Sequence, residues 1–171
     1  MGNSTDKNFP AGDFSQRDFL QKDFLRRAGW GEAKVTPLPG DASTRHYARL
    51  AANGKSALLM DQPQGAETPI GSVDASEAER RALGYNALAR IAGADTGRFQ
   101  AVADHLRARG LAAPFIHAAD HASGFVILED FGDRLFADVL AKGASEEELY
   151  EAAAEVLAKL HAQPAPRELA T

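Results

Sequence analysis

The chain contains no cysteine, which excludes disulfides, thiolate nucleophiles and zinc sites built on thiolates within its 171 residues. It has no apolar run of about 18 residues, the length that a membrane-spanning helix needs, and residues 1–12 are polar, unlike a signal peptide. Lys and Arg number 19 against 24 Asp and Glu, so the clustered cations that bind nucleic-acid phosphates are missing. We therefore expect a cytoplasmic protein with neither a nucleic-acid nor a membrane partner.

The chain contains enough apolar residues to form a packed core. Apolar residues make up 44% of the chain, and its length suits one domain, or one lobe plus part of another. Residues 1–13 are polar and show no hydrophobic period, which predicts a disordered tail.

A helix is predicted to begin at Ser15, where Asp18 three residues later resembles a capping box, and to end at Gly29. Its predicted apolar stripe is Phe19, Leu20, Phe24 and Leu25. The series Phe14, Phe19 and Phe24 is interpreted as core packing rather than a binding stripe, and Trp30 as a packing anchor between this helix and a sheet.

Five strands are predicted, at residues 34–38, 44–50, 56–61, 113–118 and 124–129. The second and third are joined through Asn53-Gly54, the strongest short-range hairpin signal in the chain. The fourth and fifth are separated by a polar turn at residues 121–123. Consecutive strands with short connections pair antiparallel.

Four further helices are predicted from apolar residues at helical spacing. One follows the capping box of Ser76 and Glu79, with Leu83, Ala87, Leu88 and Ile91 inward. After a break at residues 95–97, the next runs over residues 98–109, with Gly110 as its cap and Phe99, Val102, Ala103 and Leu106 inward. The last two are residues 134–141 and a helix capped by Ser145 and Glu148, with a stripe of Leu149, Ala153, Val156, Leu157 and Leu160. The resulting fold class is α+β, an antiparallel five-stranded lobe with inserted helices.

The architecture changes at residues 124–133, where an apolar run stops in acidic residues and Gly132. Everything before this stretch is predicted to be sheet plus helices, and everything after it helix only. Such a boundary fits an ordinary turn from strand to helix or a hinge between two lobes, and the stretch itself leaves both open.

Five segments in order, residues 37–47, 58–63, 110–114, 126–133 and 157–162, together resemble the N-terminal lobe of the aminoglycoside phosphotransferase-like kinases, a branch of the protein-kinase-like fold. Within that family the chain is most similar to bacterial anomeric sugar kinases that phosphorylate N-acetylmuramate and N-acetylglucosamine in cell-wall recycling. The resemblance covers residues 15–163. It implies an N-lobe at residues 14–131 that ends in the hinge, and the start of a truncated helical C-lobe at residues 132–171.

The resemblance also implies an ATP site. A loop at residues 40–44 would lie over the phosphates, although a tight turn explains the same residue types. The hinge backbone would pair with adenine through the Leu128 carbonyl and the Asp130 N–H. The implied cofactor-binding residues are Gly40, Asp41, Ala42, Ser43, Thr44, Met60, Leu128, Glu129, Asp130 and Phe131.

Two charges of the family pattern are missing. Met60 stands where the phosphate-holding lysine of the third strand belongs, and Gln100 stands near the position of its glutamate partner. Losing both charges leaves a neutral pair, whereas losing one would leave a charge unpaired in the cleft. Lys55 is interpreted as an exposed turn residue rather than a substitute.

No catalytic residue and no metal ligand is predicted. The family's His-x-Asp signature does not occur in the chain, and Mg²⁺ is expected only with the missing C-lobe. His117 and His121 do not share a helical face, which disfavours a zinc site. Glu129 and Asp130 are neighbours on an extended strand and point to opposite sides, which disfavours an acid/base pair. Neither Ser43 nor Ser123 has the partners of a hydrolase triad.

Two hypotheses remain. In the first, the chain is the nucleotide-binding lobe of an ATP-dependent small-molecule kinase that phosphorylates a sugar, with the catalytic half absent. In the second, it is a non-catalytic interaction module with a kinase-like lobe. A truncated lobe is expected to expose the apolar face of its last helix and to self-associate through residues 145–161.

Overall fold

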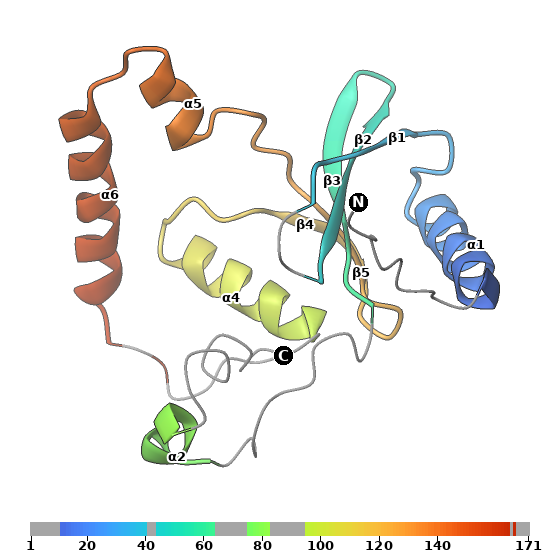
Figure 1. Cartoon of the computed structure of the whole chain (residues 1–171), viewed down its shortest axis with the longest axis horizontal. Helices are drawn as coiled ribbons and strands as arrows, with labels where there is room; N and C mark the ends of the chain where they lie inside the picture. The colour runs from blue at the N-terminus through green and yellow to red at the C-terminus, as the bar shows by residue number, and fades with distance from the viewer. Residues whose placement is uncertain (1–10, 41–43, 64–74, 83–94, 165, 167–171) are drawn as a thin grey trace, which may run out of the picture.

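The computed structural model describes residues 11–40, 44–63, 75–82, 95–164 and 166. Five strands form one antiparallel sheet in the order β1-β2-β3-β5-β4 (Figure 1). Their bounds are β1 Lys34–Pro37, β2 His46–Ala52, β3 Lys55–Asp61, β4 Ile116–Asp120 and β5 Phe125–Leu128. The predicted fold class, α+β with a five-stranded antiparallel sheet, is confirmed.

The hairpin between β2 and β3 forms where the sequence predicted it. Asn53 and Gly54 have φ angles of 51° and 73°, the two positive values that a type I′ turn requires. The register runs from Ala52 opposite Lys55 to His46 opposite Asp61. Both strands therefore extend up to the turn residues, and β2 starts two residues later than predicted.

The strands β4 and β5 are joined by the predicted turn, in which the Gly124 N–H donates to the His121 carbonyl at 3.2 Å. The predicted start of the fourth strand at residue 113 is wrong, because β4 begins at Ile116. Pro114 lacks the N–H that a ladder needs, which explains the later start. β5 is one residue shorter at each end than predicted.

One face of the sheet is covered by α1, Ala11–Arg27. Phe24 and Leu25 are buried there, and the Phe24 ring stacks on Phe125 with centroids 5.7 Å apart. The Arg17 guanidinium lies 4.2 Å from the centre of the Phe125 ring. Trp30 packs against the same core cluster, as its prediction as an anchor requires.

The predicted start and stripe of this helix need correction. Because α1 already begins at Ala11, Ser15 lies inside the helix and is not its cap. Phe19 is 69% exposed and Leu20 is 37% exposed, so neither belongs to the core. The packed face repeats at Arg17 and Phe24, and Phe19 falls on the opposite side of the helical wheel. Core packing of the phenylalanine series is thus confirmed for Phe24 and wrong for Phe19, and the side chain of Phe14 lies outside the described residues.

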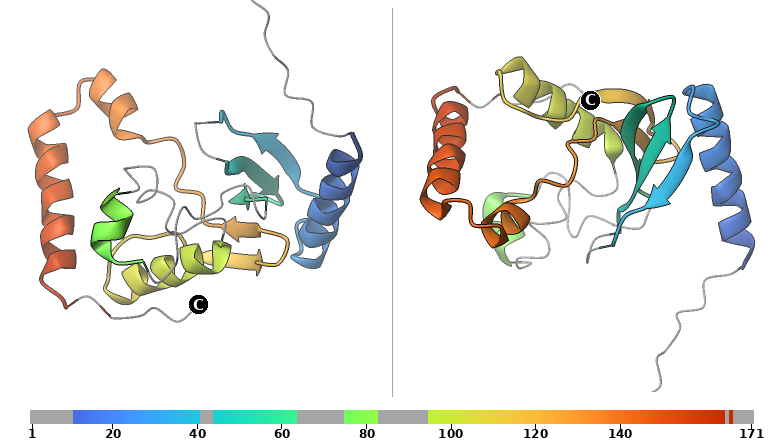
Figure 2. Two further views of the ribbon diagram at one scale, coloured as in Figure 1. Left: turned by 60° about the horizontal axis from the view of Figure 1, so that its bottom comes forward. Right: turned by 90° about the horizontal axis from the view of Figure 1, so that it is seen from above.

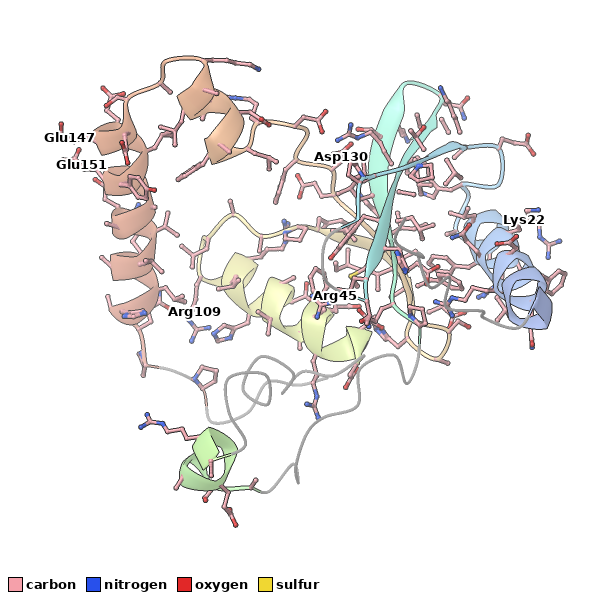
Figure 3. The ribbon with its side chains drawn as sticks, in the orientation of Figure 1. Lys22, Arg45, Arg109, Asp130, Glu147 and Glu151 are labelled. Atoms are coloured by element: carbon pink, nitrogen blue, oxygen red, sulfur yellow. The ribbon has the colours of Figure 1, made fainter. Side chains whose placement is uncertain are left out.

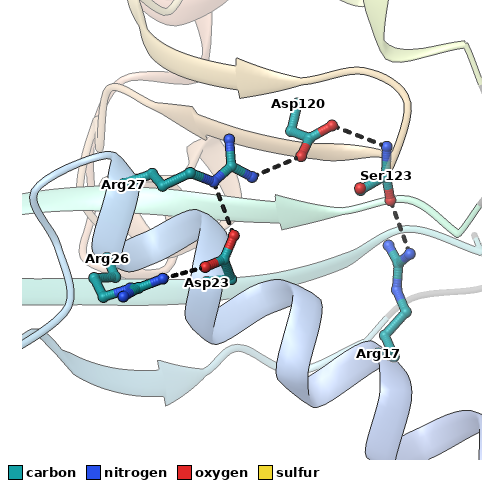
Figure 4. A network of polar contacts seen from close by, with 6 residues as sticks. All are labelled: Arg17, Asp23, Arg26, Arg27, Asp120 and Ser123. Atoms are coloured by element: carbon teal, nitrogen blue, oxygen red, sulfur yellow. Dashed lines mark hydrogen bonds and ion pairs between the residues drawn. The ribbon is translucent and has the colours of Figure 1, made fainter.

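A polar network ties α1 to the turn between β4 and β5 (Figure 4). Arg27 donates to Asp23 within the helix at 2.9 Å and to Asp120 of β4 at 3.0 Å. Asp120 accepts the Ser123 N–H at 3.1 Å, and Arg17 donates to the Ser123 carbonyl at 2.8 Å. These contacts connect two turns of α1 to the end of β4 and the turn that follows it.

The other face of the sheet is covered by α4, Thr96–Ala108, so the sheet lies between α1 and α4 (Figures 1 and 2). Asp95 caps α4, accepting the Gly97 N–H at 2.8 Å. The predicted break at residues 95–97 is therefore the start of the helix. Val102 is 47% exposed, which contradicts its predicted inward position, while its neighbours Ala101 and Ala103 are buried.

The short helix α2, Glu77–Ala82, starts with the predicted capping box. The Ser76 N–H donates to the Glu79 carboxylate at 2.8 Å, and the Glu79 N–H donates back to the Ser76 hydroxyl at 3.3 Å. The predicted apolar stripe of this helix lies outside the described residues.

The last two helices, α5 Phe136–Ala141 and α6 Glu146–His161, lie apart from the sheet (Figures 1 and 2). Ser145 caps α6 as predicted, accepting the Glu148 N–H at 3.3 Å. α5 begins two residues later than predicted. No residue of either helix is buried. Within the described part of the chain, no helix is both long and apolar enough to cross a membrane.

Candidate functional site

The site begins at the end of β5, where the buried strand gives way to two carboxylates that point apart. The Glu129 carboxylate accepts the Phe115 N–H at 3.1 Å, next to β4. The Asp130 carboxylate instead accepts from Arg49 of β2 at 2.7 Å. The predicted divergence of these two side chains is confirmed, so they do not form an acid/base pair.

The backbone of this segment presents its polar groups alternately to the two sides. The Glu129 N–H donates to the Phe115 carbonyl at 2.8 Å, toward β4. On the other side, the Gln62 N–H donates to the Gly124 carbonyl at 2.9 Å, and such pairs recur every second residue in an antiparallel ladder. Leu128, opposite Leu58, is the last pair of that ladder. The next residue whose backbone polar groups face the side of β3 is Asp130, which lies beyond the last pair of this ladder.

Arg49 joins β2 to both ends of the turn that follows β5. Besides its bond to Asp130, its guanidinium donates to the two Asp133 oxygens at 2.7 and 3.0 Å. The Asp130 side chain is only 5% exposed, whereas that of Asp133 is 78% exposed. We call this three-residue cluster the Arg49 clasp.

The clasp shifts the pKa of each carboxyl. Burial raises the pKa of Asp130, but hydrogen bonds from Arg49 and from the Gly132 N–H outweigh burial and leave it below its ordinary value. The hydrogen bonds from Arg49 lower the pKa of Asp133. The two carboxyls therefore stay ionised to a lower pH than an ordinary aspartate, and their bonds raise the pKa of Arg49.

The chain then turns sharply away from the sheet. Asp130 accepts the Gly132 N–H at 2.9 Å, and Gly132 has a φ of +75°, a backbone conformation that side chains disfavour. The Phe131 side chain between them is 59% exposed. This turn fixes the direction of the segment that leads to α5.

The predicted phosphate loop is described only at its ends. Gly40 is exposed and Thr44 is partly buried, while Asp41, Ala42 and Ser43 lie outside the described residues. The Thr44 hydroxyl accepts from the side-chain amide of Gln62 at 3.0 Å.

Next to Thr44, the Arg45 Nε donates to the Gln62 amide oxygen at 3.0 Å, and Gln62 is 1% exposed. Arg45 immediately precedes β2, four residues before Arg49, which is about 13 Å along an extended strand. Figure 3 shows Arg45 and Asp130 at separate places along the sheet, with Arg45 nearer to α4. The two polar centres therefore lie at different positions along β2, with Arg45 just before its first residue and Arg49 in its middle.

Met60 lies between these centres and is fully buried. The Tyr47 hydroxyl lies 3.4 Å from its sulfur, and Val126 and Phe99 pack in the same cluster. The third-strand position that the family pattern gives to lysine is therefore part of an apolar floor. Lys55 is exposed at the hairpin turn, at the other end of β2 from Arg45, as its interpretation as a turn residue requires.

Sequence reasoning assigned no role to Arg45, Arg49 or Gln62. A signal was present, because Arg45, Tyr47 and Arg49 recur every second residue and must share one face of β2. Two arginines on the face that also carries Met60 are unusual for a face covered by a helix. Among the described residues, no group of three or more His, Asp or Glu side chains is arranged to hold a metal ion.

Comparison with known proteins decides the family. A family model for phosphotransferase enzymes matches residues 34–170. The chain belongs to the phosphotransferase enzyme family. It is 48% identical over 141 residues to an N-acetylmuramate/N-acetylglucosamine kinase of Caulobacter vibrioides. This match covers 82% of the chain and 39% of the relative.

It is also 31% identical over 132 residues to an N-acetylmuramate/N-acetylglucosamine kinase of Pseudomonas aeruginosa, covering 75% of this chain and 31% of that relative. The chain thus spans less than two-fifths of the length of either curated relative.

Proposed function

We propose that this chain is the nucleotide-binding lobe of a phosphotransferase that moves the γ-phosphoryl group of ATP to a hydroxyl of an amino sugar. The observation that carries the proposal is the segment after β5, which places the Asp130 backbone just beyond the β3 ladder while the Arg49 clasp holds its side chain. A base-pairing edge fixed on a rigid strand end is what adenine recognition requires.

In this proposal the adenine edge meets the Asp130 N–H and the Leu128 carbonyl. A carbonyl has two lone pairs, so Leu128 can accept from the ligand as well as within the ladder. Met60 and Leu128 provide the apolar floor under the base, since both are buried on the same face of the sheet. Residues 40–44 lie over the phosphates, with Glu129 and Phe131 flanking the base.

The acceptor class is proposed from the relatives, both of which are named N-acetylmuramate/N-acetylglucosamine kinases. The reaction breaks the bond between the γ-phosphorus and the bridging oxygen of ATP and forms a bond from that phosphorus to the sugar hydroxyl oxygen. ADP leaves, and the hydroxyl proton goes to a base. We assign that base, the Mg²⁺ ligands and most sugar contacts to the part of the relatives that this chain does not span. The proposed boundaries follow, with residues 14–131 as the lobe and residues 132–171 as the start of the helical part.

The test is transfer of labelled γ-phosphate from ATP to N-acetylmuramate or N-acetylglucosamine, with glucose as the acceptor that lacks the acetamido group. The protein purified from its source cells, whose intact mass is measured first, is expected to transfer phosphate to the amino sugars. The 171-residue chain alone is expected to transfer none. Turnover by this chain would overturn the assignment of catalysis to another segment, and failure of a longer native product to phosphorylate either sugar would contradict the acceptor class.

A second candidate function, a non-catalytic interaction module, is favoured by the two missing charges at Met60 and Gln100. The two candidates differ in what they predict for the exposed helix α6. Tyr150, Val156 and Leu157 of this helix are each about half exposed, at 58%, 48% and 56%. A module of this kind would stay monomeric or bind one defined partner through α6, whereas an incomplete lobe would self-associate there. Sedimentation at several concentrations separates the two, because only self-association makes the apparent mass rise with concentration.

A further inference from the structure

We propose that Arg49 is a positioning residue for the nucleotide base, which acts through Asp130 and does not touch the nucleotide itself. The Arg49 clasp fixes the backbone at Asp130 so that the N–H of this residue points at the adenine edge. This inference rests on the proposed function, since it assumes that the base pairs with the segment that follows β5.

Arg49 lies on the face of the sheet that carries the apolar floor. It is opposite Leu58 in the register of β2 and β3, and Leu58 is opposite Leu128 in the register of β3 and β5. Side chains of directly opposite residues lie on the same face, and Leu128 belongs to the same buried cluster as Met60. On this face the Arg49 side chain reaches across β3 to Asp130, with its Nε 2.7 Å from a carboxylate oxygen.

The ladder between β3 and β5 ends before Asp130. Its last pair is at Leu128, and Asp130 lies two residues further on, beyond every pair of these strands in the described part of the chain. Arg49 bonds both oxygens of the Asp130 carboxylate, at 2.7 and 3.3 Å. On the side of β4, the Glu129 N–H is already held by the Phe115 carbonyl at 2.8 Å. Arg49 therefore supplies the tie across β3 that the ladder lacks at the residue whose N–H meets the base.

The Asp130 carboxylate passes this tie on to the backbone. It also accepts the Gly132 N–H at 2.9 Å, which closes a short turn around Phe131. The Asp130 side chain is only 5% exposed, and a buried carboxylate that loses its cation is strongly destabilised. Without Arg49 this side chain would turn toward water and take the backbone N–H with it.

The guanidinium of Arg49 is itself held from its other side. Asp133 accepts two bonds from it, at 2.7 and 3.0 Å, so Arg49 lies between two carboxylates. Paired bonds from a planar guanidinium fix orientation as well as distance, whereas an ammonium acts as a point charge. A lysine at this position would therefore hold Asp130 less firmly than arginine does.

A purely structural role for Arg49 makes a different prediction. If the clasp only stabilised the fold, its loss would weaken the binding of every adenosine analogue by the same factor. A positioning role acts on one hydrogen bond, from the Asp130 N–H to the ring nitrogen N1 of adenine. The analogue 1-deazaadenosine has a C–H in place of N1 and cannot accept that bond. The ratio of adenosine affinity to 1-deazaadenosine affinity therefore separates the two roles.

The experiment titrates the ¹⁵N-labelled 171-residue chain with adenosine and with 1-deazaadenosine, following amide shifts to obtain each Kd. We expect the unaltered chain to prefer adenosine about fivefold to tenfold, the effect of one hydrogen bond. In Arg49→Met the adenosine affinity should fall about fivefold, because the N–H is no longer aligned. The affinity for 1-deazaadenosine should change less than about twofold, so that the ratio approaches one. Arg49→Lys should give an intermediate ratio, and it keeps the test possible if Arg49→Met fails to fold.

The matched control is Arg27→Met. Arg27 also bonds two aspartates, Asp23 at 2.9 Å and Asp120 at 3.0 Å, but these contacts join α1 to β4 and do not reach the segment after β5. This variant loses a similar set of ion pairs, and we expect it to keep the affinity ratio of the unaltered chain.

The contrary outcomes differ from one another. A ratio that is unchanged in both Arg49 variants, whether or not the separate affinities fall, would overturn the positioning role and leave the nucleotide site intact. An equal change of the ratio in Arg27→Met would also overturn it, because any lost ion pair would then act through the fold. If the unaltered chain bound neither nucleoside, or bound both equally, the proposed pairing of the base with Asp130 would itself fall.

Discussion

β5 and α6 are both rich in apolar residues, yet they differ completely in burial. All four residues of β5 are buried, with α1 and α4 covering the two faces of the sheet, whereas α6 has no buried residue along its length. Two leucines make the contrast concrete, since Leu59 of the neighbouring strand β3 is 1% exposed and Leu157 of α6 is 56% exposed. An apolar stripe thus predicts which element forms, but how much that stripe contributes to the free energy of unfolding depends on what packs against it.

The largest effect is expected when the same substitution, leucine to alanine, is made once in the sheet and once in α6. Leu59→Ala should lower the free energy of unfolding by about 2–5 kcal/mol, because it removes buried methyl groups and leaves a cavity. Leu157→Ala should change it by less than about 0.5 kcal/mol, because its side chain is already hydrated. Urea unfolding of both variants checks the pair, and equal losses would show that α6 is packed in solution.

A second pair of substitutions tests the Arg49 clasp, which lies in the segment between β5 and α5. Asp130→Ala should lower the urea midpoint clearly, since it removes acceptors from Arg49 and from the Gly132 N–H at a side chain that is 5% exposed. Asp133→Ala should lower it less, because that carboxylate is 78% exposed and exposed ion pairs contribute little. A larger loss for Asp133→Ala than for Asp130→Ala would contradict the geometry of the Arg49 clasp.

Acid should act on the same clasp. Both carboxyls have folded-state pKa values below the ordinary value, so the folded chain binds fewer protons than the unfolded chain. Their contribution is fully present above the ordinary aspartate pKa of about 4 and is lost as pH falls through the lower folded values. Unfolding midpoints measured from pH 6 to 2.5 should show a steeper acid loss for the unaltered chain than for Asp130→Ala. Identical acid profiles would mean that Asp130 titrates normally.

The smallest effect on global stability is expected at the start of α6. Ser145→Ala removes the hydroxyl that accepts the Glu148 N–H, and loss of such a cap costs a helix about 1 kcal/mol. Because α6 makes little contact with the sheet, the loss should stay local. Hydrogen exchange should speed up in α6 alone, with the urea midpoint of the sheet unchanged. Faster exchange in β5 as well would show coupling between the two regions.

Local signals predicted local structure well. The two positive φ angles at Asn53 and Gly54 and the reciprocal bonds of Ser76 and Glu79 all involve residues within a few positions of one another. Their geometry depends on neighbouring side chains and backbone, which a single sequence displays directly. The order and type of the strands followed from such signals.

Features that depend on tertiary contact were less accessible. The helical period alone placed Phe19 and Val102 inward, but α1 and α4 meet the sheet along other faces. The Arg49 clasp joins residues 81 and 84 positions apart. No local pattern indicates such a pairing, and alternation along β2 could only have shown that Arg45 and Arg49 share a face. The candidate hinge was located from the sequence, whereas the side chains that fix it were found in the structure.

The most direct test of the account is to map adenosine on the ¹⁵N-labelled chain, because adenosine carries the base and no phosphate. We predict that the largest amide shifts fall at residues 128–131 and at Met60 on the floor of the site, with no shift along α6. Shifts concentrated in α6, or none at saturating adenosine, would contradict a nucleotide site at the end of β5.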